Sequence, residues 1–143
     1  MISKKGRYAI RFMIDLAEQR PDKPIPLDEI ADRQNISKKH LENIARLLVA
    51  GKAVKGFDEG RDGGYRLLRN PEEYTVYEIL SLTESALCSV TCLEQDVDEC
   101  PRRDNCKTLP IWQEYDKIAR KYFSGITLAN LVNNHSPNTE PSF

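Results

Sequence analysis

Residues 27–51 have the sequence LDEIADRQNISKKHLENIARLLVAG. Apolar residues recur there at helical spacing, which predicts one helix over about 27–33 and another over about 38–50. Between them, Asn35 tolerates a left-handed backbone, and the hydroxyl of Ser37 can accept a free amide at the start of the second helix. Two helices joined by so tight a turn are typical of a helix-turn-helix, although many helical hairpins that do not bind DNA share the pattern.

A hairpin is predicted directly after this unit. Residues 53–57 and 65–68 are suited to two short strands, and residues 58–64 between them are charged and rich in glycine. A flexible hairpin that follows a helix-turn-helix is a wing, whose tip can approach a phosphate or a groove. Taken alone, the segment is also compatible with an ordinary surface hairpin.

Helical patterns flank the hairpin on both sides. Thr75 and Thr127 are suited to cap two short helices. Ile36 is expected to anchor the tight turn in the core, and Gly51 to end the helix before the wing. The fold class that follows is mainly α: a winged helix-turn-helix with a small β-hairpin wing and a long C-terminal dimerisation helix. The predicted elements are 2–19, 27–33, 38–50, 53–57, 65–68, 76–83, 110–123 and a short helix after residue 127.

The long helix over residues 110–123 has a broad apolar and aromatic face. Its side chains recur three and four residues apart, as in a coiled-coil seam. One alternative is that this face covers only the core of its own domain, but a chain of 143 residues has a modest core. We therefore expect a homodimer, whose interface is formed by Trp112, Tyr115, Ile118, Ala119 and Tyr122.

Charge is divided unevenly along the chain. Residues 1–70 contain 15 Lys and Arg against 10 Asp and Glu, whereas residues 71–143 contain 6 against 12. Such a division indicates one part that faces nucleic acid and a separate second part, although chance scatter of surface charge is the alternative. We expect a DNA-binding domain over 1–70, a cysteine loop with the dimerisation helix over 71–133, and a disordered tail over 134–143.

The sequence lacks the marks of a membrane protein, a secreted protein or an enzyme. No stretch approaches the ~20 apolar residues of a membrane helix, and charged residues interrupt the N-terminal run where a signal peptide is continuous. We therefore expect a cytoplasmic location and no membrane partner. There is no glycine-rich phosphate loop after a strand and no Ser/His/Asp set, and the chain has only two histidines. An electron-transfer or redox enzyme is therefore disfavoured.

Four cysteines lie in a segment without hydrophobic periodicity: Cys88, Cys92, Cys100 and Cys106. Their spacing, C-x3-C-x7-C-x5-C, differs from the ferredoxin run and from the paired knuckles of structural zinc sites. In a reducing compartment, cysteines favour metal or redox chemistry over disulfides. Thiolates are soft ligands that bridge well to iron, so an iron–sulfur cluster is favoured. Zinc and a metal-free thiol switch stay open.

Several motifs resemble those of the Rrf-type winged-helix transcription regulators, which include IscR-, NsrR- and CymR-like members. The motifs are KGRYA (residues 5–9), ISKKHLE (36–42), the wing segment GGYRL (63–67) and the cysteine loop. The resemblance covers residues 1–133 and is greatest to the IscR-like branch, which binds an iron–sulfur cluster. CymR-like members lack the cysteine loop.

This resemblance implies a homodimeric regulator of a double-stranded DNA operator, acting as a repressor, whose DNA affinity responds to the cluster. The alternative is a cluster-free regulator of the same type that responds to a partner protein, a small molecule or thiol oxidation.

The resemblance also implies a ligand set. The implied cluster ligands are Cys92, Cys100 and Cys106. The fourth-ligand positions of IscR-like and NsrR-like members fall at Leu109 and near Arg7, and neither side chain binds iron. Cys88 is therefore the candidate fourth ligand, and a 2Fe–2S cluster is favoured over a 4Fe–4S cluster.

The start of the 38–50 helix is the predicted reader of DNA bases, because these positions of a helix-turn-helix meet base edges in the major groove. The resemblance implies Glu42 as the principal base reader. IscR-like wings place an arginine in the minor groove; that position is Glu59 here, so Arg61 is expected to substitute. The residues expected on bases are Lys38, Lys39, His40, Glu42 and Asn43. Those expected on phosphates are Ser37, Lys4, Lys5 and Arg46.

Overall fold

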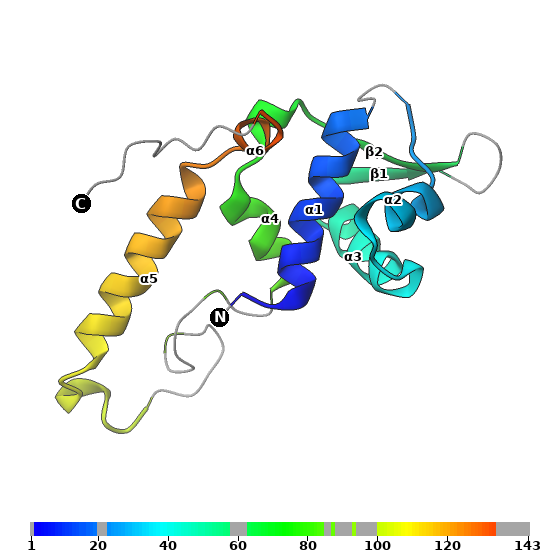
Figure 1. The fold of residues 1–143 in the computed structure, drawn as a ribbon. Coiled ribbons are helices and arrows are strands. Elements are labelled where there is room, and N and C mark those ends of the chain that lie inside the picture. The colour runs from blue at the N-terminus through cyan, green and yellow to red at the C-terminus, as the bar shows by residue number, and fades with distance from the viewer. Residues whose placement is uncertain are drawn as a thin grey trace.

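The computed structural model describes residues 2–19, 23–57, 63–84, 87, 93 and 100–133. Helices dominate this part of the chain and accompany a two-stranded hairpin, which confirms the predicted mainly α class (Figure 1). The predicted disordered tail, 134–143, lies outside the described residues. The elements are α1 (Lys4–Gln19), α2 (Leu27–Gln34), α3 (Lys38–Ala50), β1 (Val54–Phe57), β2 (Gly64–Leu67), η1 (Pro71–Glu73), α4 (Val76–Thr83), η3 (Arg103–Asn105), α5 (Leu109–Ser124) and α6 (Leu128–Val132).

α1 is the central helix of the fold. It contacts α2 and α3 on one side and α4 and α6 on the other, whereas α5 contacts α4 and projects away from the rest (Figure 1). The main core includes Tyr74, Ile79 and Leu128. The chain after residue 70 therefore packs into the same core as the helix-turn-helix. The fully buried apolar side chains of α1, α2 and α3 are Ala9, Phe12, Met13, Leu16, Ile30, Leu41, Ile44, Ala45 and Leu48.

The turn between α2 and α3 has the predicted geometry. Asn35 adopts a left-handed backbone with φ 52° and ψ 48°, which closes α2. Ile36 is 5% exposed and anchors the turn in the core. The Ser37 hydroxyl accepts a hydrogen bond from the His40 amide, 3.3 Å away. The helix-turn-helix is thus specified by local interactions that the sequence makes visible.

Gly51 ends α3 as predicted, but with a different backbone geometry. Its φ is −83°, so it is not a left-handed helix stop; the next residue, Lys52, takes φ 57° instead. A Cβ at Gly51 would lie 2.3 Å from Cδ2 of Leu82. A side chain at this position would therefore require Leu82 of α4 to move. Leu47, in the last turn of α3, is half-buried.

The two strands of the hairpin lie within one residue of their predicted limits. β1 and β2 pair antiparallel, with Val54 opposite Leu67 and Lys55 opposite Arg66. The base of the hairpin is held by Tyr74, whose side chain is fully buried. The Tyr74 hydroxyl donates to the carbonyl of Ala53 at 2.5 Å and accepts from the amides of Leu68 and Arg69 at 3.1 and 3.0 Å.

The C-terminal helices join the core through backbone hydrogen bonds. Thr75 and Thr127 cap α4 and α6 as predicted, by accepting from the amides of Glu78 and Asn130. The amide of Val76 donates to Ile126, and that of Leu128 donates to Tyr74, at 2.9 and 3.0 Å. The end of α5 is therefore tied to the start of α4.

Within the described residues, no helix has the length and apolar content to span a membrane.

One carboxylate is buried between α1 and α2. Asp15 is 1% exposed. Its carboxylate accepts hydrogen bonds from the Arg33 guanidinium at 2.8 and 3.1 Å and from the side-chain amide of Gln34 at 3.0 Å. These hydrogen bonds raise the pKa of Arg33. The same Gln34 accepts from Arg11 through its side-chain oxygen at 3.2 Å and through its backbone carbonyl. Charged hydrogen bonds therefore fix α2 against α1 directly before the turn.

Replacing Asp15 with asparagine is expected to lower the free energy of unfolding by about 1–3 kcal/mol, because charge-assisted hydrogen bonds in a buried position are lost. Arg33 is 34% exposed and can turn to water, so the loss stays below that of a fully buried pair. Urea unfolding followed by circular dichroism measures it. Glu29→Gln is the control, because Glu29 pairs with Arg33 at an exposed position, where ion pairs contribute little. Equal losses in the two variants would contradict this account.

Candidate DNA-binding face and cysteine pocket

The N-terminal half of α3 presents a polar face to solvent. The predicted base contacts on this helix are all exposed, whereas Leu41, Ile44 and Leu48 point into the core. Lys38 forms an exposed ion pair with Asp28 of α2 at 3.1 Å. The structure therefore gathers on one helix surface the side chains that sequence reasoning selected: Ser37, Lys38, Lys39, His40, Glu42 and Asn43.

The basic start of α1 lies beside this face. Lys4 and Lys5 are exposed there. The ring of Tyr8 lies 6.2 Å from that of His40, which brings α1 next to the first turn of α3. Lys4 and Arg11 also lie over the Tyr8 ring, 5.7 and 5.4 Å from its centre. Sequence reasoning did not select Tyr8 as a residue of this face. The only sequence signal for it was its position in a basic segment.

A shallow groove separates α3 from the wing. Its volume is about 470 Å³, and it is lined by Glu42, Arg46, Val49, Gly56, Phe57 and Tyr65. Val49 is 41% exposed at this place, and Arg46 is exposed beside it. The groove joins the predicted base reader Glu42 to the hairpin. Arg61, the predicted minor-groove contact, lies outside the described residues.

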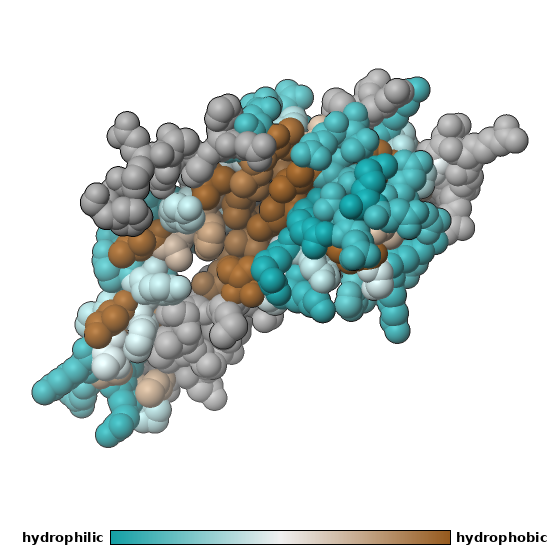
Figure 2. All heavy atoms as spheres, viewed as in Figure 1, coloured by the Kyte–Doolittle hydropathy of each residue, from teal (hydrophilic) through white to brown (hydrophobic). Residues whose placement is uncertain are grey.

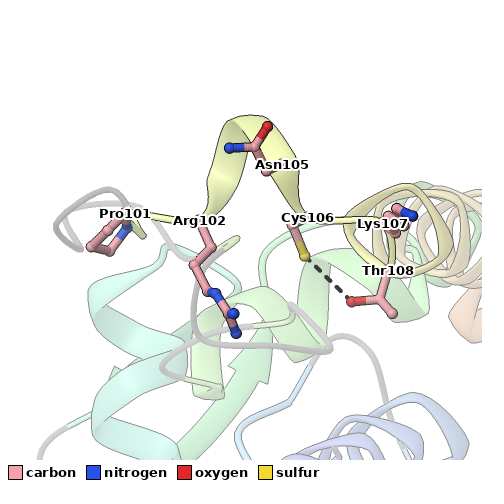
Figure 3. Close-up of a pocket in the computed structure, with 6 residues that line it drawn as sticks. All are labelled: Pro101, Arg102, Asn105, Cys106, Lys107 and Thr108. Atoms are coloured by element: carbon pink, nitrogen blue, oxygen red, sulfur yellow. Dashed lines mark hydrogen bonds between the residues drawn. The ribbon is translucent and has the colours of Figure 1, made fainter.

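The described cysteines flank a small turn before α5. Cys100 is exposed and Cys106 half-buried, on either side of η3. A cavity of about 490 Å³ opens here, lined by Pro101, Arg102, Asn105, Cys106, Lys107 and Thr108. In Figure 3, the side chains of Arg102 and Cys106 point to the same side of the turn, and that of Asn105 points away.

The environment of Cys106 favours its thiolate. Its sulfur lies 3.3 Å from the Thr108 hydroxyl (Figure 3). Hydrogen bonds from the Thr108 side chain and backbone lower the pKa of the Cys106 thiol, and Arg102 adds to the effect. Thiolates are the form that binds iron. The donor chemistry at Cys100 and Cys106 therefore fits a thiolate-ligated metal.

The other two cysteines, Cys88 and Cys92, lie outside the described residues. Over the ranges that the structure describes, no group of three or more His, Cys, Asp or Glu side chains comes together to hold a metal.

Glu84 connects the start of the cysteine segment to α1. Its carboxylate accepts from the backbone amide and the hydroxyl of Ser3, at 2.9 and 2.7 Å. The Ser3 hydroxyl in turn accepts from the Gly6 amide at 3.1 Å and so caps α1. A Cβ at Gly6 would lie 2.1 Å from the Glu84 oxygen, so the contact requires glycine. Sequence reasoning did not single out Glu84.

α5 carries an apolar stripe that faces solvent. Tyr115, Ile118 and Tyr122 are 60%, 59% and 47% exposed. Ile111 continues the stripe at 58%, whereas Trp112 lies at its edge at 37%. Ala119, expected in the dimer interface, is half-buried on the side of α5 nearer the protomer's own core. The exposed seam therefore runs through residues 111, 115, 118 and 122.

The distribution of apolar surface separates two regions of the molecule. In Figure 2, apolar side chains gather over α1, α4 and α6 and continue in patches on α5, while polar side chains cover α2 and α3. The partly buried hydrophobics in this region include Ile10, Ile14 and Leu131. The apolar region and the polar face of α3 are thus available to different partners.

Known proteins are similar to this chain in both sequence and fold. The chain matches the family described as "Rrf2: Iron-dependent Transcriptional regulator" over residues 2–134. The HTH-type transcriptional regulator IscR of Pectobacterium atrosepticum is 32% identical over 133 residues, which are 93% of this chain and 79% of that protein.

Two solved structures are also similar. CymR, the global cysteine regulator of B. subtilis, has a TM-score of 0.73 at 30% identity, covering 94% of this chain and 97% of that one. IscR of T. potens has a TM-score of 0.74 at 27% identity, covering 100% and 93%. These similarities confirm the resemblance found in the sequence and the winged-helix class.

Proposed function

Because this chain belongs to the Rrf2 family of transcriptional regulators, we propose that it is a homodimeric repressor whose operator affinity responds to an iron–sulfur cluster. Its relatives are named as regulators, and the family is not enzymatic. The observation that supports the proposal most is the exposed polar half of α3, flanked by the basic start of α1. Such a surface suits a duplex, since base edges and phosphates are reached from neighbouring elements.

In this proposal α3 enters the major groove. Lys38 and Lys39 donate to guanine, Glu42 accepts from the cytosine amino group, and Asn43 pairs with adenine. His40 lies at the same end of the helix and contacts a base or its phosphate. Phosphates are held by Ser37, Lys4, Lys5 and Arg46, and Arg61 at the wing tip enters the adjacent minor groove.

Dimerisation would use the exposed stripe of α5. Four large apolar side chains at coiled-coil spacing are costly to leave in water, and Figure 2 shows further apolar surface on α1, α4 and α6. A second copy of the chain covers both surfaces at once if its α5 crosses this region. The two copies of α3 then read two half-sites about one helical turn apart, ~34 Å along the duplex.

The cluster would be held by Cys92, Cys100 and Cys106, with Cys88 as the fourth ligand and 2Fe–2S as the cluster type. When bound, an iron–sulfur cluster supplies a centre that oxygen, nitric oxide or iron shortage can alter. Cys100 and Cys106 present accessible sulfurs, and Thr108 and Arg102 stabilise the thiolate of Cys106. This donor chemistry supports the cysteines of the segment as soft ligands.

Anaerobic purification tests the cofactor directly. We expect iron, acid-labile sulfide and visible absorption in the unaltered protein, and loss of most of the iron in Cys106→Ala because a thiolate ligand is removed. Asn105→Ala is the control, since Asn105 lines the same cavity but points away from Cys106. A colourless, iron-free protein, or an operator affinity that ignores the cofactor, would contradict the proposal.

The alternative regulator without a cluster is favoured by one observation. The half-buried thiol of Cys106 has a lowered pKa, which is typical of cysteines that are oxidised reversibly. Under this alternative, the iron-free protein binds DNA with full affinity, and mild peroxide changes that affinity only when Cys106 is present.

A further inference from the structure

The outer side of the wing carries a pair of cations. Lys55 and Phe57 are two residues apart on β1 and so share one side of the hairpin. Arg66 lies directly opposite Lys55 in the register and therefore shares that side. Both charged groups lie over the Phe57 ring, with Lys55 Nζ and the Arg66 guanidinium carbon 5.3 and 5.2 Å from its centre.

This arrangement is unfavourable for the hairpin alone. Like charges directly opposite each other on paired strands destabilise a sheet. In the described part of the chain, neither Lys55 nor Arg66 forms an ion pair; the ion pairs there belong to Arg33, Lys38 and Arg69. The Phe57 ring attracts both cations and holds them together, but it does not neutralise them. A surface built in this way suits an anion with several charges.

The other side of the hairpin shows which way the pair faces. Val54 and Leu67 are buried on that side. A Cβ at Gly56 would lie 3.9 Å from Cγ2 of Val49, so the inner side of the wing faces α3. If α3 occupies the major groove and the wing enters the next minor groove, the inner side meets the phosphate strand between the two grooves. The outer side then meets the other strand, because the minor groove is only ~6 Å wide.

We propose that Lys55 and Arg66, held together by Phe57, bind phosphates of the DNA strand on the outer side of the wing. This proposal rests on the proposed function. It is also supported by the composition of the tip, residues 58–62, in which Asp58, Glu59 and Asp62 outnumber Arg61. Arg61 is then the single cation of the tip, so the strands supply the further cations with which the wing holds phosphates.

The salt dependence of DNA binding tests the proposal. The probe is a duplex enriched from a randomised pool by the unaltered protein. For Lys55→Gln with Arg66→Gln, we expect affinity to fall about 10–100-fold at ~0.1 M salt, and the slope of log affinity against log salt to become shallower by about 0.9 for each lost contact. Base preference stays unchanged, because phosphate contacts carry no sequence information. The melting temperature changes little, because the loss of the repulsion offsets the loss of both contacts with the Phe57 ring.

Lys117→Gln with Lys121→Gln is the matched control, since it removes two exposed cations from α5. It should leave the slope nearly unchanged. An unchanged slope in the wing variant, or an equal change in both variants, would overturn the proposal. If the unaltered protein enriches no duplex, the proposed function itself fails, and the wing proposal fails with it.

Discussion

Replacing Tyr115 and Ile118 together with aspartate is expected to convert the proposed dimer into a monomer and to lower operator affinity about 10²–10⁴-fold. Both side chains are more than half exposed in the protomer, so the change leaves its own core intact. Charges in a seam between two copies of α5 would be buried without partners. A monomer engages one half-site at a time and loses the high effective concentration of the second α3. Sedimentation and electrophoretic mobility shift measure the two effects.

The matched control is Lys117→Asp, a charge change on the polar side of α5. It should preserve both the dimer and DNA binding. Circular dichroism establishes that the double variant retains its helices. A monomeric variant that still binds the operator with full affinity would refute the role of two half-sites, and a variant that remains dimeric would refute the α5 interface.

Removing the Tyr74 side chain is expected to have the largest effect on stability. Tyr74 is fully buried, and Tyr74→Ala should lower the free energy of unfolding by about 3–5 kcal/mol, as for other large aromatic side chains. This loss is a large fraction of the stability of a small domain. Tyr74→Phe keeps the ring and removes the hydroxyl that joins Ala53, Leu68 and Arg69, so it should cost about 1–3 kcal/mol.

Chemical unfolding of the two Tyr74 variants measures these losses. Tyr77→Phe is the control, because the Tyr77 hydroxyl meets only Arg120 among the described residues, at an exposed position. A near-zero effect of Tyr74→Phe would show that the hydroxyl does not hold the wing base. Amide hydrogen exchange measures the loosening of the wing separately. We expect faster exchange in β1 and β2 of Tyr74→Phe.

The features that the sequence predicted correctly depend on neighbouring residues. Asn35, Ser37, Thr75 and Thr127 act through the backbone within a few residues, so residue type and spacing are enough to identify them. The amphipathic pattern likewise placed α1 and α3 correctly. The exposed residues of α3 could be identified because its exposed side is the complement of its buried side.

Contacts between distant residues were not visible in the sequence. The Tyr74 hydroxyl bond to Ala53 spans 21 residues, and the Ser3–Glu84 contact spans 81. Neither contact produces a periodic pattern in one sequence. The close approach of Leu82 of α4 to Gly51 was not visible for the same reason. The predicted seam of α5 included Ala119, which is half-buried in the protomer. Spacing alone does not show which side of a helix faces the core of its own chain.

The Glu84 carboxylate couples the middle of the chain to its N-terminal helix. It stands where the cysteine segment begins, yet its hydrogen bonds anchor Ser3, the residue that caps α1. If the segment after residue 84 rearranges and withdraws this carboxylate, Ser3 loses its acceptor and the first turn of α1 frays. Lys4 and Lys5 then lose their fixed position without any rotation of the helix. A signal carried in this way acts by local melting, and so alters the entropy of DNA binding more than its contacts.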